Sequence, residues 1–174
     1  MKTPILALSL VLASTSLFAN ESIITDTQKE KSNGVYINAG QFSIGDNFEI
    51  LNIGVGYQET RINNLFWSVG GQAGINMDLP DDEAQVLVSA EGKLGYSFNN
   101  VPGQVIQLIP YVGVSVGADV NEDSYSSGSE FFTKVFVGGE IRLTDTVGVY
   151  FNQGMMTISG SNKNFSELGA RISF

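Results

Sequence analysis

A set of charged residues recurs at alternate positions of extended segments. These residues are the main candidates in this chain for acid–base catalysis or for ion pairing. The set comprises Glu91, Lys93, Lys134, Glu140, Arg142, Glu167 and Arg171. Two carboxylates that flank a substrate can act as general acid and general base in glycoside hydrolysis, and Glu140 and Glu167 are the candidates for that work. Acids and bases on one face can instead form hydrogen-bonded ion pairs, which buried charges require.

The composition removes the commonest catalytic and metal-binding groups. The 174 residues include no cysteine and no histidine, which excludes disulfides, Cys/His zinc sites, cysteine nucleophiles and histidine-containing triads. There are 18 Asp and Glu residues against 9 Lys and Arg, a net charge of −9, and this acidity argues against a nucleic-acid partner. We therefore expect a protein that is not an enzyme and that needs no cofactor.

Acidic residues also gather between the extended segments. Asp81, Asp82 and Glu83 follow one another directly, and carboxylate oxygens are ligands for Ca²⁺ and Mg²⁺. Their spacing does not match an EF-hand loop. A weak divalent-cation rim at these residues therefore competes with a simple solvated acidic surface, and the sequence predicts no specific metal site.

The charged set lies within a long series of segments in which aliphatic residues alternate with polar or small ones. This period of two is typical of β-strands, because successive side chains point to opposite faces of a sheet. Short, turn-rich breaks between the segments favour an antiparallel meander. The alternating segments lie near residues 35–40, 51–58, 65–76, 86–98, 112–119, 131–142, 147–152 and 167–174.

The amino terminus is typical of an exported protein. Lys2 is followed by an apolar run over 5–13 and by small residues up to Ala19, a pattern that predicts a signal peptide over residues 1–19. The run is too short to cross a bilayer as a helix. Residues 20–33 are polar and charged, so we expect a flexible periplasmic leader before a strand-rich domain over 34–174.

Alternation alone does not say which face of the strands is covered. A soluble barrel hides its aliphatic face, whereas a membrane barrel turns that face to lipid. The polar face here carries many glycines, among them Gly54, Gly70 and Gly113, as a narrow barrel interior requires. We therefore expect an all-β fold, an eight-stranded antiparallel up-and-down transmembrane β-barrel. A periplasmic soluble β-barrel that binds an apolar ligand is the alternative if the faces are inverted.

The end of the chain resembles a known family. Leu168, Ala170, Ile172 and Phe174 form an alternating apolar series that ends on a terminal aromatic residue. The series resembles the assembly signal of bacterial outer-membrane barrels, and residues 34–174 are similar in length and strand rhythm to the OmpA/OmpX-type small barrels. The resemblance implies the outer membrane of a Gram-negative bacterium, assembly by periplasmic chaperones and the barrel-assembly machinery, and contact with outer-membrane lipid and lipopolysaccharide.

In a barrel of this kind, two hypotheses compete for the role of the charged set. An eight-stranded barrel has an interior just wide enough for side chains to fill, so we expect the charges to form a lumen ion-pair network in a monomer with a structural or surface-interaction role. The alternative is a narrow, weakly cation-preferring channel that opens when the lumen ion pairs rearrange.

Overall fold

The computed structural model describes residues 33–45, 48–61, 63–76, 85–99, 106–121 and 130–174. The predicted signal peptide (1–19), the leader up to residue 32 and the acidic stretch of Asp81, Asp82 and Glu83 lie outside these ranges. The described chain forms strands joined by turns. They are β1 (Asn33–Ile44), β2 (Phe48–Thr60), β3 (Leu65–Asn76), β4 (Gln85–Tyr96), β5 (Phe98–Asn99), β6 (Gln107–Asn121), β7 (Glu130–Arg142), β8 (Val147–Ile158) and β9 (Ser161–Ser173).

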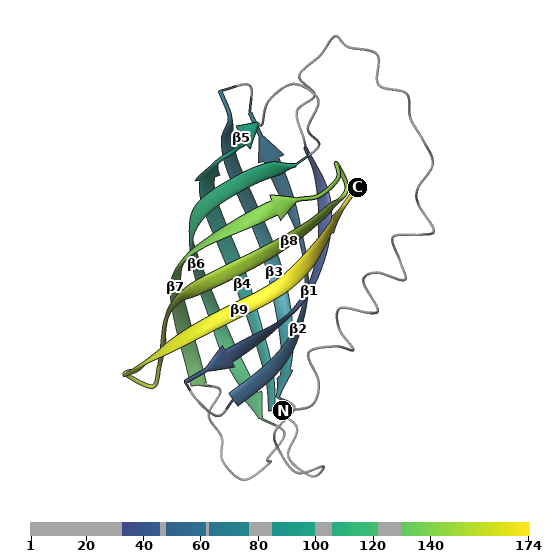
Figure 1. The fold of residues 1–174 in the computed structure, drawn as a ribbon. Helices are drawn as coiled ribbons and strands as arrows, with labels where there is room; N and C mark the ends of the chain where they lie inside the picture. Colours follow the sequence, from purple (N-terminus) through teal and green to yellow (C-terminus); the bar gives the residue numbers. More distant parts are fainter. Residues whose placement is uncertain (1–32, 46–47, 62, 77–84, 100–105, 122–129) are drawn as a thin grey trace. The chain divides into compact units, whose positions relative to one another are not determined.

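The strands form one closed antiparallel sheet, as predicted. Each long strand pairs with its neighbours in the sequence, β1 pairs with β9, and β4 pairs directly with β6. The short β5 only extends the edge of β6, so eight strands close the barrel. Figure 1 shows these strands as a single layer, strongly tilted as they wind around the barrel. Among the described residues, no helix is long and apolar enough to span a membrane.

The two ends of the barrel are named by the strand ends that lie there. We call the end where β1 begins and β9 finishes the terminal end; β2 and β7 also finish there, and β3 and β8 begin there (Figure 1). The opposite end, which we call the far end, includes the β1–β2 turn at Gly45 and the β8–β9 turn.

The β8–β9 connection is shorter than the sequence pattern indicates. The alternating segments of the sequence end near 152 and resume near 167, whereas β8 continues to Ile158 and β9 begins at Ser161. The connection is a turn of Ser159 and Gly160, which have positive φ angles of 48° and 78°. Two central residues with positive φ make the type I′ turn, whose twist suits a two-residue hairpin. Strand β9 therefore begins at Ser161.

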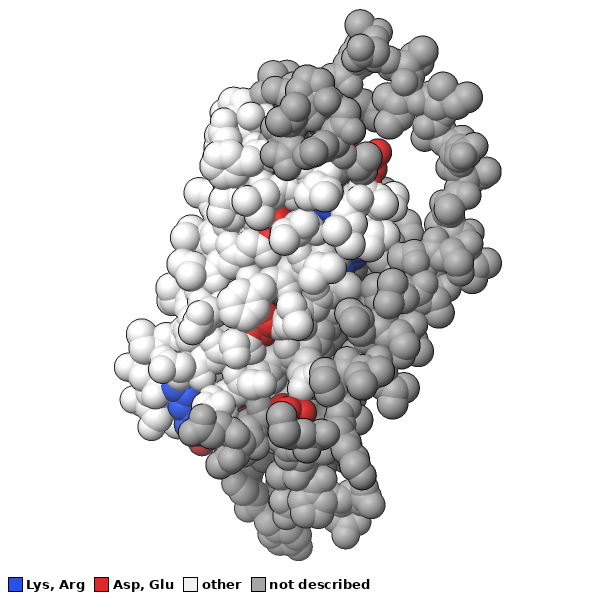
Figure 2. All heavy atoms as spheres, in the orientation of Figure 1, with Lys and Arg blue, Asp and Glu red and all other residues white. Residues whose placement is uncertain are grey.

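Aliphatic side chains cover the outside of the barrel and charged ones lie within it. Val55, Val69 and Val137 are 55%, 51% and 62% exposed, whereas Glu91 and Arg171 are 5% and 1% exposed. Charged side chains occupy little of the described surface visible in Figure 2. This arrangement confirms the predicted fold class and is the reverse of the arrangement in a soluble barrel.

Aromatic residues mark the terminal end of the outer wall. The Tyr57 and Trp67 rings lie 5.7 Å apart between centroids, and Tyr96 and Phe98 lie 5.0 Å apart. The indole Nε1 of Trp67 donates a 3.0 Å hydrogen bond to Glu59. Large rings with a polar edge suit the boundary between an apolar layer and water.

Candidate functional site: the barrel interior

The interior near the terminal end is organised around one carboxylate. Glu140 Oε1 lies 2.9 Å from Arg142 Nε, and Glu140 Oε2 lies 2.7 Å from an Arg171 guanidinium nitrogen. All three side chains are almost fully buried. Arg142, Gly148 and Arg171 lie in one register row across β7, β8 and β9. A side chain at Gly148 would press on the Glu140 carboxylate. This glycine therefore leaves the space in which Glu140 of β7 contacts Arg171 of β9.

Arg171 is held on two further sides. Its NH1 atom donates a 3.0 Å hydrogen bond to Gln58, and its guanidinium lies 4.1 Å from the centre of the Tyr36 ring. Gln58 in turn donates to Ser173 at 2.8 Å. The ion pair, the hydrogen bond and the stacked ring offset part of the loss of water, and Arg171 Nε and NH2 have no hydrogen-bond partner among the described residues.

Glu167 lies in a second cluster that contains no basic ion-pair partner among the described side chains. Asn52 donates to its Oε1 at 2.6 Å and Asn152 donates to its Oε2 at 2.9 Å. The Tyr150 hydroxyl donates to Oε1 at 3.2 Å. Three donors from two strands, β2 and β8, therefore surround this carboxylate and satisfy its oxygens, as a buried charge requires.

Glu91 and Lys93 form a third cluster on a single strand. Lys93 Nζ lies 2.7 Å from Glu91 Oε1, and both side chains are buried. The ammonium also lies 5.4 Å from the ring centres of Tyr111 and Tyr150 and 5.8 Å from that of Phe136. Aromatic faces attract a cation, so the rings reinforce the ion pair.

Towards the far end, aromatic rings lie beside buried polar side chains. Lys134 is buried there, with its ammonium 5.1 Å, 5.6 Å and 6.0 Å from the ring centres of Phe42, Phe165 and Phe132. These rings belong to one contiguous hydrophobic cluster. Its members are Phe42, Ile50, Phe66, Leu87, Ile109, Tyr111, Phe132, Phe136, Met156 and Phe165.

Aromatic and amide residues of this interior are not among the residues predicted from the sequence. Tyr36, Tyr150, Asn38 and Asn152 are 0–1% exposed, as buried as the charged set. They alternate along their strands in the same phase as the charges, and this phase is the signal that could identify them. The glycines of that phase predict a narrow interior, but they do not predict the large rings that occupy the space beside them.

Tyr150 shows how glycines and rings are matched. A Cβ atom at Gly40 would lie 2.7 Å from the Tyr150 hydroxyl, and one at Gly169 would lie 2.5 Å from the ring. Only a residue without a side chain leaves this room. The inward rings therefore fill the space that the inward glycines leave.

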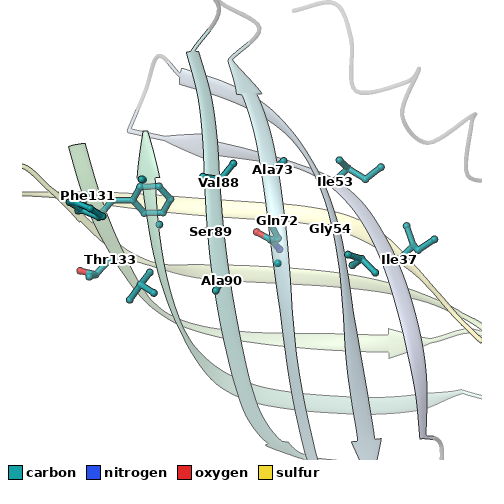
Figure 3. Close-up of a pocket in the computed structure, with 16 residues that line it drawn as sticks. Ile37, Ile53, Gly54, Gln72, Ala73, Val88, Ser89, Ala90, Phe131 and Thr133 are labelled. Carbon is teal, nitrogen blue, oxygen red and sulfur yellow. The ribbon is translucent and has the colours of Figure 1, made fainter. Parts of the chain in front are cut away.

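The structure brings the predicted lumen residues into one interior but not into one site. Glu140 and Glu167 belong to separate clusters, each held by its own partners, so they do not flank a common substrate position. An apolar hollow exists instead on the outer wall, where Ile53, Val88 and Phe131 project (Figure 3). The described residues that line this hollow include no Asp, Glu, Lys or Arg.

The other predicted sites fall elsewhere on the molecule. Leu168, Ala170 and Ile172 lie on the outward face of β9, and Phe174 follows the strand with 69% of its surface exposed. Within the described ranges, no group of three or more acidic residues could hold a metal ion.

The closed sheet, the apolar outer wall and the side-chain-filled interior define a class: the chain has the fold of the small eight-stranded outer-membrane β-barrels. Neisserial surface protein A shares this fold with a TM-score of 0.54 and 18% identity, covering 82% of this chain and 97% of that one. The N-terminal β-barrel domain of Pseudomonas aeruginosa OprF has a TM-score of 0.54 and 17% identity, covering 83% and 100%.

A third solved structure has the same architecture. Ail, the attachment invasion locus protein of Yersinia pestis, has a TM-score of 0.50 and 14% identity, covering 82% of this chain and 97% of that one. No family model matches the sequence, and the search of curated proteins finds no match. At these identities the likeness establishes the fold alone.

Proposed function

We propose that this chain is a non-catalytic outer-membrane protein with a closed interior and a structural or surface-interaction role. The observation that carries the proposal is the combination of an exposed aliphatic wall with an interior that holds Glu140, Glu167, Arg171 and the hydrophobic cluster. In hydrocarbon only a closed barrel or a helix satisfies the backbone, and this sheet is closed.

The structural neighbours support this location. All three are outer-membrane-type barrels of similar length, and one is described as a surface protein and another as an attachment invasion locus protein. A signal peptide over 1–19 would direct export, and the alternating series from Leu168 to Phe174 would serve as the assembly signal. Lipid and lipopolysaccharide would surround the wall of a single barrel.

Membrane residence is tested by fractionating cells that express the full chain. We expect the folded protein in the outer-membrane fraction, released by detergent but not by high salt or carbonate, and migrating differently on a gel before and after heating. Recovery as a soluble periplasmic protein would contradict the proposal.

A narrow channel remains the second candidate because some buried polar atoms need water. Glu91 Oε2 and Ser115 Oγ have no hydrogen-bond partner among the described residues, and these two residues are cross-strand neighbours on β4 and β6. Single-channel recordings distinguish the candidates. A closed barrel shows no conductance in the wild type, in Glu140→Ala or in Arg171→Ala, whereas a gated channel opens when either variant breaks the lumen pairs.

A further inference from the structure

The outer wall changes character halfway along three neighbouring strands. From the terminal end, the outward residues of β9, β1 and β8 begin as apolar and then become polar. The sequence of outward residues is Phe174, Ile172, Ala170, Leu168, Ser166 and Asn164 on β9; Val35, Ile37, Ala39, Gln41 and Ser43 on β1; and Val147, Val149, Phe151, Gln153, Met155 and Thr157 on β8. On β8 the exposed Met155 is the one apolar outward residue between the polar Gln153 and Thr157. We call Gln41, Ser43, Gln153, Asn164 and Ser166 the polar seam.

The polar seam is continuous across the strands. Ser166 is the register partner of Gln153 on β8 and of Ser43 on β1. These side chains lie on the outer face, because their chain neighbours Phe165, Glu167 and Asn152 are buried in the interior. Towards the far end the seam continues into Thr157 and Asn162, which share a 2.7 Å hydrogen bond.

The opposite wall stays apolar at the same level. Ser166 is the fifth outward residue from the terminal end on β9, and the fifth outward residues of β4 and β6 are Val88 and Val116, 42% and 60% exposed. Beyond them, Val86 and Val120 extend the apolar wall towards the far end. The apolar belt is therefore tall over β3, β4 and β6 and short over β8, β9 and β1.

Tilting the barrel in a bilayer cannot level this belt. At the terminal end the wall across from the seam does not begin later to make up for its greater height, because it extends past Leu108 to the exposed Ile106 and Phe98. A tilt moves both boundaries of the belt together, so it cannot give a tall side and a short side the same height. The mismatch therefore belongs to the side of the polar seam.

Two properties of the seam indicate what contacts it. Its five members are neutral amides and hydroxyls, which lose hydrogen bonds to water if they face acyl chains. The seam also lacks the aromatic and arginine anchors that dominate protein interfaces. A hydrated layer of lipid headgroups supplies donors and acceptors without such anchors.

We propose that lipid headgroups and interfacial water reach down along the polar seam, so that the leaflet at the far end is locally thinner beside β8, β9 and β1. The inference rests on the proposed membrane residence of the barrel. Bilayers adapt to a short hydrophobic surface by thinning at modest cost. The seam is then a place where the barrel weakens that leaflet.

The absence of cysteine from the sequence makes this proposal directly testable. Ser166→Cys and its control Val88→Cys are each labelled with a nitroxide and folded into palmitoyl-oleoyl phosphatidylcholine vesicles. Collisions of the label with dissolved oxygen report a hydrocarbon environment, and collisions with a water-soluble nickel chelate report an aqueous one. We expect nickel accessibility at position 166 to exceed that at 88 severalfold, and oxygen accessibility to be lower.

Each other outcome has a distinct meaning. Equal, oxygen-rich environments at both positions would overturn the thinning while leaving membrane residence intact. Nickel access at both positions would instead contradict membrane residence itself. Protection of position 166 from both reagents, or disulfide cross-linking of Ser166→Cys between copies, would show a protein partner on the seam and also overturn the proposal.

A second variant guards against effects of the label. Gln41→Leu, Gln153→Leu and Ser166→Leu combined extend the apolar belt over the seam. We expect this triple variant to fold more completely than the wild type in bilayers with longer acyl chains, judged by the heat-sensitive gel shift. An unchanged dependence on chain length would contradict the thinning.

Discussion

At the scale of single residues, the charge balance at the terminal end of the interior depends on Glu140. This carboxylate faces two guanidinium groups, those of Arg142 and Arg171. Removing one member of a buried ion pair is costly because it leaves the partner's charge buried and uncompensated. Glu140 is therefore the position where one neutral substitution affects two buried cations.

We expect Glu140→Gln to lower the free energy of unfolding by about 3–5 kcal/mol. The measurement is urea unfolding of the detergent-folded barrel, followed by the heat-sensitive gel shift. Arg61→Ala is the control, because Arg61 is largely exposed and its contact with Glu59 is 3.6 Å. Exposed pairs contribute about 0–1 kcal/mol. Equal effects of the two substitutions would show that the interior is hydrated enough to screen its charges.

Glycines give a second test at the residue scale. Gly169→Ala puts a Cβ atom 2.5 Å from the Tyr150 ring, and overpacking of this kind costs about 1–3 kcal/mol. Gly71 lies on the outer wall, where the nearest atom to a Cβ would be 3.6 Å away. Gly71→Ala should therefore leave stability unchanged or slightly raised. Equal stability of both variants in the same unfolding assay would rule out a tightly packed Tyr150.

At the scale of elements, the β8–β9 hairpin depends on two positive φ angles. Gly160 has φ +78°, a conformation that an L-residue adopts at a cost of about 1–2 kcal/mol. We expect Gly160→Ala to lower the free energy of unfolding by that amount. Ser159→Asn should have no cost or should stabilise the turn, because asparagine tolerates this conformation. A Gly160→Ala variant as stable as the wild type would show that the turn relaxes to another type.

The last strand carries the prediction about assembly. We expect Phe174→Ala to reduce the amount of folded barrel in the outer membrane, with unfolded chain accumulating in the periplasm. Phe131→Ala is the control, because Phe131 is 79% exposed but lies at the far end of the wall. If both variants reach the membrane equally well, Phe174 is an ordinary surface aromatic and the assembly signal lies elsewhere.

The elements also show how far sequence reasoning extends. A period of two predicts the strands and the face on which Glu91, Glu140 and Arg171 lie, because alternation is a property of each strand alone. The partners of these residues do not follow from it. Glu140 and Arg171 lie on β7 and β9, with β8 between them. They meet across Gly148 of β8, which has no side chain to press on the Glu140 carboxylate. Such a contact depends on register and closure.

At the scale of the whole molecule, the barrel has a largely uncharged wall around an interior that side chains fill. The ion pair of Glu140 and Arg171 lies near the terminal end, and the rings of Phe42, Phe132 and Phe165 surround Lys134 towards the far end. Eight-stranded barrels are just wide enough for side chains to fill them in this way. This filling favours a closed barrel over a channel.

The central claim is that the aliphatic face of every strand meets acyl chains and the charged face is enclosed. It is tested most directly by vesicles whose lipids carry a photoreactive carbene precursor within the acyl chain, with the labelled residues located by mass spectrometry. We predict labelling of outward residues such as Val55, Val112 and Val137, and none of Lys93, Tyr111 or Arg171. Labelling of the second group, with the first group protected, would contradict the account.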